Sequence, residues 1–553
     1  MKSRAAVPIL GLLLTMLFGT LSLSAQARQL PAPTADVSLT FQVTLPPETP
    51  AADTIYIAGN FTGWNPGSTP MQRSGNTASI TLSFAAGTNL EYKYTRGSWS
   101  SVEKAADGSE LANRTTTADA DRTVSDSVAR WADVQNEPGP DVTMSVSVTL
   151  PQTTQPGDTI YIAGNFQGWN PSATPLVRSG LQATGTITVS EGSTLEFKFT
   201  RGSWGSVEQT AECVNIPNRT AVATVGGTIS ASVAAWADRC TVVYDPRVEK
   251  IALDSQTLGV AKEFYVYTPP EYSARPGLRY PTLYLFRGHE REWINQQEDS
   301  TRGGRNVIDV YEELLAAGQV GPMILVFPGI SSADNSVSGM LTNFLAPELT
   351  SAAGVGTGRF EDYLVQELVP YVDGHYRTVP TRSGRGVDGF SLGGFMSTKI
   401  ASQHPELFST AGAFDGLYFY ADATCQSIAE SDGVFGLSLF DPVFDQPRDR
   451  AYAAANNAPN IVCNRSVAEV RSIRWLIQYG PESAEPSDAN FYRGEHLRHK
   501  LIQKGVTGPL PAILAGGHNW RTADEHMRQT LPHHWAALRL SARASVYLPL
   551  LAR

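Results

Sequence analysis

The chain contains little histidine and little cysteine, and the positions of both exclude several kinds of chemistry. All nine histidines among the 553 residues lie beyond residue 280, so the first half of the chain has no side chain suited to general-base catalysis near pH 7. The four cysteines form no Cys-x-x-Cys pair and have no histidine at ligand spacing, which excludes the common zinc motifs. We therefore expect no metal ion and no cofactor.

The chain also lacks clusters of basic residues and, after its N-terminus, long apolar runs. The formal net charge is -10, which disfavours a nucleic-acid partner. No stretch of the mature chain is apolar over the length needed to cross a bilayer, so we predict no transmembrane segment. A hydrophobic content of 42% without a dominant low-complexity block indicates a globular protein. The length predicts roughly two to four domains.

The N-terminus has the pattern of a secretory signal peptide. Met1–Arg4 is positively charged, Ala5–Leu23 is mostly apolar, and Ala25–Ala27 is an A-x-A cleavage site. Residues 1–27 are therefore predicted to be removed, and the mature protein is predicted to be secreted and extracellular. An uncleaved N-terminal anchor is the alternative.

The four cysteines of a secreted chain predict two disulfides. Three pairings are possible. By proximity along the chain we pair Cys213 with Cys240 and Cys425 with Cys463.

The first half of the chain is a duplication with a period of 105 residues. Thr54–Phe61 returns as Thr159–Phe166 with the same eight letters. The same offset relates Trp64 to Trp169, Lys93 to Lys198, Trp99 to Trp204, Asn113 to Asn218 and Trp131 to Trp236. A constant offset without insertions indicates two copies of one whole domain, a tandem pair rather than a solenoid array.

Each copy has the pattern of an antiparallel β-sandwich. Alternating segments such as Ser38–Leu45 and Leu90–Thr95 are separated by clusters of Gly, Pro and Asn. We predict two immunoglobulin-like modules, module 1 (residues 36–134) and module 2 (residues 142–240), joined by a polar, proline-containing linker (residues 135–141).

Both modules contain three further shared motifs: Ala-Gly-Asn-Phe-x-Gly-Trp-Asn-Pro, Leu-Glu-Tyr/Phe-Lys-Tyr/Phe-x-Arg, and a closing Asn-Arg. In these motifs the modules resemble the starch-binding modules of carbohydrate-binding module family 20. In that family an aromatic pair and a lysine form the main glucan site. Where the family has its second tryptophan this chain has Lys104 and Gln209, and Trp99 and Trp204 lie a few residues upstream as substitutes.

Sugar rings stack their apolar faces on indoles, while their hydroxyls need donors such as Lys or Asn. The predicted glucan-binding residues are Trp64, Lys93, Trp99 and Asn113 in module 1, and Trp169, Lys198, Trp204 and Asn218 in module 2. For Trp131 and Trp236, which end the modules, we predict positions in the core instead.

From about Val243 the pattern changes to alternating strands and helices. Predicted strands include 263–268, 281–286, 323–327, 410–414, 475–479 and 511–514, and predicted helices include 308–317, 362–376 and 491–504. Such alternation predicts a mostly parallel sheet with both faces covered. We assign residues 244–541 to this C-terminal domain and residues 542–553 to a tail.

The C-terminal domain contains the pattern G-x-S-x-G at Gly389–Gly393, between a predicted strand and a predicted helix. In such a nucleophile elbow the serine hydroxyl stands clear of the sheet, which makes Ser391 the predicted nucleophile; a simple Gly-Ser turn is the alternative. His518 follows the last predicted strand in a glycine-containing loop and is the predicted general base, with a structural loop histidine as its alternative.

The C-terminal domain resembles the esterase D and enterochelin-esterase-like family of serine hydrolases over residues 245–540. Tyr363–Arg377, the Gly-Phe-Ser-Leu-Gly-Gly elbow and Gly-Gly-His-Asn-Trp carry the resemblance, which implies an α/β-hydrolase fold with the order Ser, acid, His. The family's acid lies in Gly-x-x-Asp, where this chain has Ser483. Counting back from the following helix places Asp488 at the acid position, and Glu482, Glu485 and Asp415 remain alternatives.

The oxyanion hole is predicted to use the backbone N–H of Leu392 and, as second donor, that of His289 in the loop after strand 281–286. Together these features predict a secreted serine carboxylic-ester hydrolase tethered to α-glucan such as starch, with an ester as its substrate. An acyltransferase onto a sugar hydroxyl, and a non-catalytic carbohydrate-binding protein with a degenerate hydrolase domain, are the alternatives.

Overall fold

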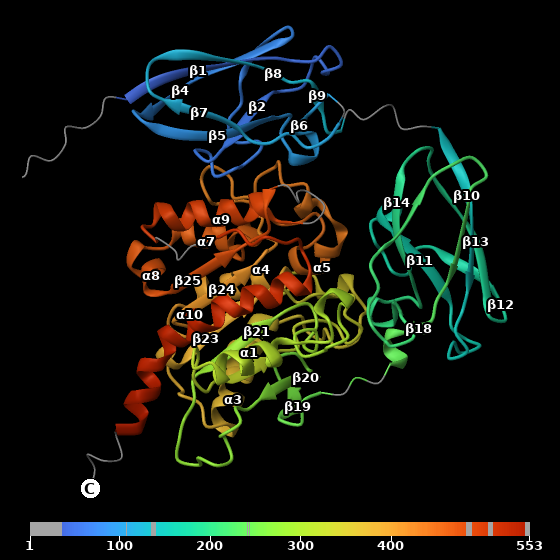
Figure 1. Cartoon of the computed structure of the whole chain (residues 1–553), viewed down its shortest axis with the longest axis vertical. Coiled ribbons are helices and arrows are strands. Elements are labelled where there is room, and N and C mark those ends of the chain that lie inside the picture. Colours follow the sequence, from blue (N-terminus) through green and yellow to red (C-terminus); the bar gives the residue numbers. More distant parts are fainter. Residues whose placement is uncertain are drawn as a thin grey trace, which may run out of the picture.

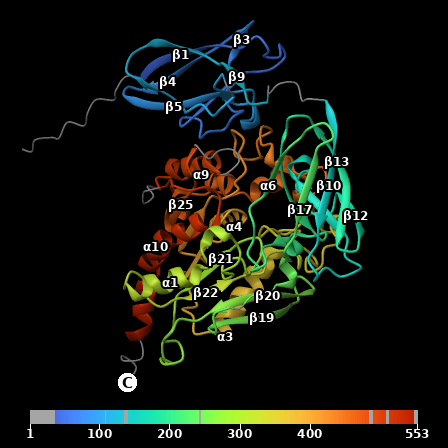
Figure 2. The same cartoon turned by 45° about the vertical axis from the view of Figure 1, so that its right-hand side comes forward.

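The computed structural model describes residues 36–106, 108–133, 140–240, 242, 244–482, 489–506 and 512–547. The C-terminal domain forms the centre, module 1 lies over helix α9 (Phe491–Gln503), and module 2 lies at the side (Figures 1 and 2). The predicted signal peptide and most of the predicted linker lie outside the described residues. No helix in the described ranges is long and apolar enough to span a membrane.

The strands of module 1 recur in module 2 at the 105-residue offset. Module 1 contains β1 (Asp36–Thr44), β2 (Tyr56–Gly59), β3 (Gln72–Ser74), β4 (Thr77–Ala85), β5 (Thr88–Thr95), β6 (Glu103–Lys104), β7 (Arg114–Ala118), β8 (Arg122–Ser127) and β9 (Arg130–Trp131). Module 2 contains β10 (Asp141–Thr149), β11 (Ile160–Gly164), β12 (Pro175–Ser179), β13 (Gln182–Ser190), β14 (Thr194–Thr200), β15 (Glu208–Gln209), β16 (Arg219–Val222), β17 (Thr228–Ser232) and β18 (Ala235–Trp236).

The expectation of purely antiparallel pairing is wrong at one place in each module. β1 pairs with β8, and β10 with β17, in parallel. β8 enters the sheet of β1 directly after β7, which belongs to the other sheet, so no hairpin fixes its direction. Alternation of apolar residues shows which face of a strand is buried but not the direction in which the strand pairs.

Trp131 and Trp236 are fully buried in the cores of their modules, as predicted. Their indole N–H groups donate to the hydroxyls of Thr49 and Thr154 at 2.9 and 2.8 Å. Each buried indole therefore keeps a hydrogen-bond partner, which removes the cost of burying its polar atom.

The C-terminal domain is built on a seven-stranded sheet in the order β19-β20-β22-β21-β23-β24-β25. The strands are β19 (Val248–Ser255), β20 (Val260–Tyr267), β21 (Thr282–Phe286), β22 (Ile324–Phe327), β23 (Arg385–Gly389), β24 (Thr410–Phe414) and β25 (Arg474–Gln478). β20 runs antiparallel to both of its neighbours, and the other pairs are parallel. This confirms the mostly parallel sheet.

Helices cover both faces of this sheet. The helices are α1 (Val307–Ala316), α2 (Phe360–Asp362), α3 (Val369–His375), α4 (Leu392–Gln403), α5 (Asp441–Phe444), α6 (Arg450–Ala455), α7 (Ala458–Asn464), α8 (Val467–Ser472), α9 and α10 (Trp520–Tyr547). One core lies beneath α1 and α10, and the other beneath α3, α4 and α7 to α9. Alternate side chains of β20, β21 and β22 enter opposite cores. α10 continues to Tyr547, into the predicted tail.

Both predicted disulfides are formed. Cys213 pairs with Cys240 and Cys425 with Cys463, with Cα–Cα distances of 5.6 and 6.3 Å. The second disulfide joins the segment after β24 to α7, within the run of short helices between β24 and β25 that the sequence pattern did not predict.

Candidate active site

Ser391 lies on a sharp turn between β23 and α4, with backbone angles of φ 60° and ψ -120° that non-glycine residues rarely adopt. Gly389 and Gly393 are required on either side of Ser391, because the backbone packed against them leaves no room for a Cβ atom. A Cβ at Gly389 would lie 2.1 Å from the Gly393 carbonyl oxygen, and one at Gly393 would lie 1.9 Å from the Phe286 carbonyl oxygen. The strained turn is the geometry of a nucleophile elbow, and it explains the G-x-S-x-G spacing.

His518 reaches the elbow from the loop before α10. Its Nε2 lies 2.9 Å from the Ser391 hydroxyl oxygen, so this predicted pair is in hydrogen-bond contact. Its Nδ1 lies 2.5 Å from Oδ2 of Asp415. Ser391, His518 and Asp415 thus form a continuous chain of hydrogen bonds.

Asp415 is the first residue after β24, and its carboxylate is fully buried. Its Oδ1 accepts hydrogen bonds from the backbone N–H groups of Gly480 and Asn490 at 3.1 and 2.9 Å, and the Asn490 side chain donates to the Asp415 carbonyl at 2.9 Å. Three donors fix the residue, whose φ of 51° is also strained. Oδ2 is left to face His518.

The structure corrects the assignment of the acid. Asp488, the predicted residue, lies outside the described residues, as do Glu485 and Ser483. Glu482 is turned away from His518 toward module 1, where it lies 3.2 Å from the Lys93 ammonium. The carboxylate at His518 belongs to Asp415, at the end of β24 rather than after β25. The order Ser, acid, His is kept.

The two predicted oxyanion donors differ in their surroundings. Leu392 is the first residue of α4, so its N–H is one of those that no intrahelical carbonyl can reach. The prediction for His289 is contradicted, because its N–H donates to the carboxylate of Glu292 three residues later. Glu292 in turn lies 3.2 Å from Arg287, which stacks over Phe390 beside the elbow.

The predicted glucan-binding residues of module 1 lie together, but they face the C-terminal domain. Trp64 and Trp99 are 6.2 Å apart, and Trp64 and Lys93 are each only 2% exposed. Asn113 lies at the same joint, 3.4 Å from the hydroxyl of Tyr492 on α9. The expectation of an accessible glucan site in module 1 is therefore contradicted in this structure, because the joint between domains covers it.

The corresponding residues of module 2 are more open. Trp169 and Trp204 are half-buried and 6.1 Å apart, and Asn218 donates to Glu196 within the module. Lys198 donates to Asn215 and to the Ile216 carbonyl at 2.9 and 2.6 Å, and burial lowers its pKa.

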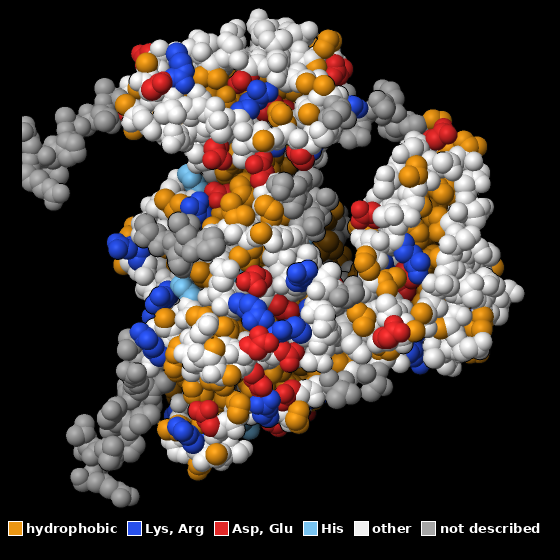
Figure 3. Space-filling model, viewed as in Figure 1, with side chains coloured by type: hydrophobic (Ala, Val, Ile, Leu, Met, Phe, Trp, Pro, Cys, Tyr) orange, Lys and Arg blue, Asp and Glu red, His pale blue; other side chains and the backbone are white. Residues whose placement is uncertain are grey.

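A cavity of about 100 Å³ lies where module 2 meets the C-terminal domain, next to Trp204. Its lining includes Asn215 from module 2 and Asn295 and Glu298 from the C-terminal domain. Burial, aided by the charge of Glu292, raises the pKa of Glu298 above its usual range. A hollow also opens between these two parts on the face shown in Figure 3.

Residues 255–533, just over half of the chain, match the family model described as Esterase. The chain belongs to the Esterase family. The match includes Ser391, Asp415 and His518 and lies within the α/β-hydrolase-like C-terminal domain.

Two curated proteins and one solved structure illustrate the similarity. The N-terminal region is 47% identical over 105 residues to an amylopullulanase of Thermoanaerobacter thermohydrosulfuricus, a match that covers 18% of this chain and 7% of that protein. The chain is 28% identical over 172 residues to an esterase of Mycobacterium tuberculosis (strain H37Rv), covering 31% of this chain and 33% of that protein. It thus spans a third or less of the length of either relative. A ferulic acid esterase structure matches with a TM-score of 0.41 and 20% identity over 53% of this chain and all of that one.

A second polar cluster of the esterase lies beneath the elbow and was not predicted from the sequence. Asp388 lies three residues before Ser391, and its carboxylate accepts a hydrogen bond from the Thr530 hydroxyl. Its Oδ1 lies 3.1 Å from Nε2 of His526, and its Oδ2 lies 2.9 Å from Nε2 of His534. Burial would raise the pKa of Asp388, but His526 and His534 outweigh it and hold the pKa below its usual range. The available signal in the sequence was the spacing of His526, Thr530 and His534, which lie four residues apart and therefore on one face of a helix. In the described ranges, no group of His, Cys, Asp or Glu is arranged to hold a metal ion.

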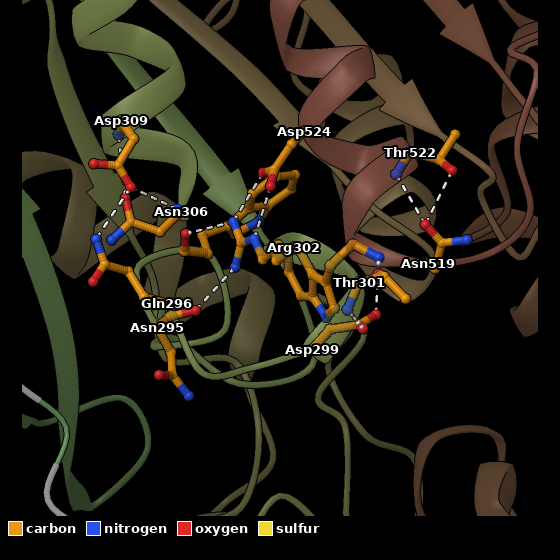
Figure 4. A network of polar contacts seen from close by, with 12 residues as sticks. Asn295, Gln296, Asp299, Thr301, Arg302, Asn306, Asp309, Asn519, Thr522 and Asp524 are labelled. Carbon is orange, nitrogen blue, oxygen red and sulfur yellow. Dashed lines mark hydrogen bonds and ion pairs between the residues drawn. The ribbon is translucent and has the colours of Figure 1, made fainter. Parts of the chain in front are cut away.

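Arg302 joins the loop after β21 to the first turns of α10, the helix that follows His518 in the chain (Figure 4). Its buried guanidinium makes two 2.9 Å contacts with Asp524 on α10, donates to three backbone carbonyls of its own loop, and lies 4.5 Å from the Trp520 ring centre. The carboxylate of Asp299, in the same loop as Arg302, accepts a hydrogen bond from the backbone N–H of Trp520 at 3.3 Å. Arg302 therefore acts as a positioning residue for the start of α10, directly after the loop of His518.

Replacing Arg302 with methionine is expected to lower the free energy of unfolding by about 3–5 kcal/mol, because it leaves the Asp524 carboxylate and three carbonyls without their partner. Denaturant unfolding measures this loss, and kcat should fall with it as the histidine loop loosens. Arg305→Met is the matched control, since Arg305 lies three residues after Arg302 and forms an exposed ion pair with Glu313. The control should cost less than about 1 kcal/mol. Equal losses in the two variants would contradict the positioning role.

Proposed function

We propose that the chain is a secreted serine carboxylic-ester hydrolase that uses Ser391, His518 and Asp415 as its triad and is held on α-glucan by module 2. The observation that carries the proposal is the unbroken hydrogen-bonded chain from the Ser391 hydroxyl through His518 to the buried Asp415. It also supports an active domain over a degenerate one, because His518 has a carboxylate partner although the family's acid position holds Ser483.

The geometry supports an acyl-enzyme mechanism. Ser391 attacks the ester carbonyl while His518 Nε2 takes its proton, and the charge of Asp415 stabilises the resulting imidazolium. The Leu392 N–H is placed to bind the oxyanion of the tetrahedral intermediate. His518 then returns the proton to the leaving alcohol, and an acyl group remains on Ser391. Water, activated by the same histidine, releases the acid and restores the enzyme.

The glucan half of the proposal rests on module 2. We propose β-sandwich modules of the starch-binding kind, with bounds of 36–134 and 142–240, and a C-terminal catalytic domain over 244–541. The 47% identity with an amylopullulanase supports this, as does the half-buried indole pair of Trp169 and Trp204. The two disulfides suit export to an oxidising compartment, which the predicted signal peptide would direct.

The test is whether esterase activity sediments with insoluble starch and whether this depends on Trp169. The full chain is incubated with starch, and turnover of p-nitrophenyl acetate is measured in pellet and supernatant. Trp169→Ala should weaken adsorption at least about tenfold, a loss of about 1.4 kcal/mol, without changing turnover in solution. Val177→Ala is the control, because Val177 is an apolar residue of module 2 that is 76% exposed on β12. Adsorption that survives Trp169→Ala would contradict the assigned glucan site.

A further inference from the structure

The two modules present the same aromatic pair, so their surroundings can be compared directly. Trp64 and Trp99 are 6.2 Å apart at an interplanar angle of 43°, and Trp169 and Trp204 are 6.1 Å apart at 44°. We call each pair the platform of its module. Trp64 and Trp169 even share a left-handed backbone, with φ of 55° and 58°. The platforms are therefore equivalent, and a difference in their use must come from what lies against them.

A tyrosine of the C-terminal domain lies on the platform of module 1. The ring of Tyr492 stacks on Trp99 at 3.8 Å between centres and 6° between planes, and it lies 5.1 Å from Trp64. A flat six-membered ring held parallel to an indole at contact distance occupies the place where a sugar ring would stack. The platform is thus filled from within the chain.

The polar groups expected to bind sugar hydroxyls are also engaged. The Tyr492 hydroxyl donates to Glu482 at 2.9 Å and lies 3.4 Å from the Asn113 side-chain oxygen. The Lys93 ammonium lies 3.2 Å from the same Glu482 oxygen. A hydroxyl and a carboxylate of the C-terminal domain therefore replace the sugar hydroxyls at Lys93 and Asn113.

Further hydrogen bonds join module 1 to the C-terminal domain around this contact. His496, also on α9, lies 2.8 Å from the Gly63 carbonyl, and Asn65 donates to the Ala421 carbonyl at 3.0 Å. Trp64 itself packs into the core cluster of the C-terminal domain. Acidic side chains gather along this joint, and module 1 lies over α9 in both ribbon views (Figures 1 to 3).

Module 2 shows no such occupant in the described part of the chain. The only aromatic partner of Trp169 there is Trp204. Beside Trp204 lies the cavity of about 100 Å³ instead of a side chain stacked on the indole. The platform of module 1 is covered by an aromatic ring, whereas Trp204 of the other platform borders a cavity at the joint with the C-terminal domain.

We infer that Tyr492 occupies the platform of module 1 in place of a sugar ring and thereby docks module 1 on the C-terminal domain. In this docked state module 1 is closed to free α-glucan. The inference rests on the proposed function, in which such platforms bind α-glucan. A chain in this state has one accessible glucan site, on module 2, rather than two. Free glucan reaches module 1 only by displacing Tyr492.

The docked segment also supports the active site. Tyr492 follows two residues after Asn490, whose N–H and side chain hold Asp415, and Glu482 follows two residues after Gly480, whose N–H binds the same carboxylate. Module 1 thus contacts Glu482 and Tyr492, each two residues beyond a backbone N–H donor to the triad acid.

The test is the number of maltoheptaose sites on the full-length mature protein, measured by isothermal titration calorimetry. One site is expected for the wild type, none for Trp169→Ala, and two for Tyr492→Ala, which empties the platform of module 1. Tyr492→Phe keeps the stacked ring and should retain one site. The Trp169→Ala result needs no change in the C-terminal domain, so it remains decisive if Tyr492→Ala fails to fold.

Two outcomes would overturn the inference and are distinguishable. Two sites in the wild type, or one remaining site in Trp169→Ala, would show that module 1 is open, while glucan binding by the modules would stand. No binding in any variant, including folded Tyr492→Ala, would overturn the inference together with the glucan half of the proposed function.

Discussion

Replacing Ser391 with alanine is expected to lower kcat for p-nitrophenyl acetate by about 10⁶-fold, the loss seen when a nucleophile that works as a unit with its histidine is removed. Ser391 is the residue whose hydroxyl lies 2.9 Å from His518 on the strained elbow. Stopped assays at high enzyme concentration are needed to measure the residual rate.

Ser397→Ala is the matched control for this experiment. Ser397 is a buried serine on α4, the helix that begins directly after Ser391. Its hydroxyl donates to the carbonyls of Gly394 and Gly412 at 3.1 and 2.7 Å. Its loss should cost about 1 kcal/mol of stability and leave most of the turnover. Comparable turnover in Ser391→Ala and the wild type would show that the esterase chemistry lies elsewhere.

Replacing Asp415 with asparagine is expected to lower kcat about 10⁴-fold, as for other triads in which the acid becomes an amide. The Oδ1 position accepts two backbone N–H groups, so the amide oxygen would stay there and the NH₂ group would face His518. His518 would then carry its proton on Nε2 and could not accept one from Ser391. The size of the side chain and the fold are preserved.

Asp488→Asn decides between the two candidate acids. Turnover within a few fold of the wild type is expected, because His518 is paired with Asp415. Both variants should be compared at the same pH and after confirming equal melting temperatures. A large loss in Asp488→Asn with an active Asp415→Asn would restore the assignment made from the sequence.

The contact between Ser391 and His518 could be predicted because local rules determine where both residues lie. The glycines around Ser391 are fixed by contacts of 2.1 and 1.9 Å, and such restrictions are visible in one sequence. The acid follows no such rule. It needs only a carboxylate at the end of a neighbouring strand, and both β24 and β25 end at the same edge of the sheet. An aspartate directly after a buried strand, as in Phe414-Asp415-Gly416, was the available signal.

The modules show a similar limit. The repeat predicted equivalent strands and correctly placed Trp131 and Trp236 in the cores, because these depend on contacts within each copy. Identical letters in the two copies could not predict that Trp64 lies against Tyr492, while Trp204, the ring partner of Trp169, borders a cavity. That difference depends on a partner several hundred residues away along the chain.

The measurement that tests the central claim most directly is the mass of the intact protein and of its peptides after treatment with a fluorophosphonate. One adduct per chain is expected, located on the peptide that contains Ser391, with none on the Ser391→Ala variant. Loss of esterase turnover should follow the extent of labelling one to one. An adduct on another residue, or full turnover after Ser391 has been modified, would contradict the account.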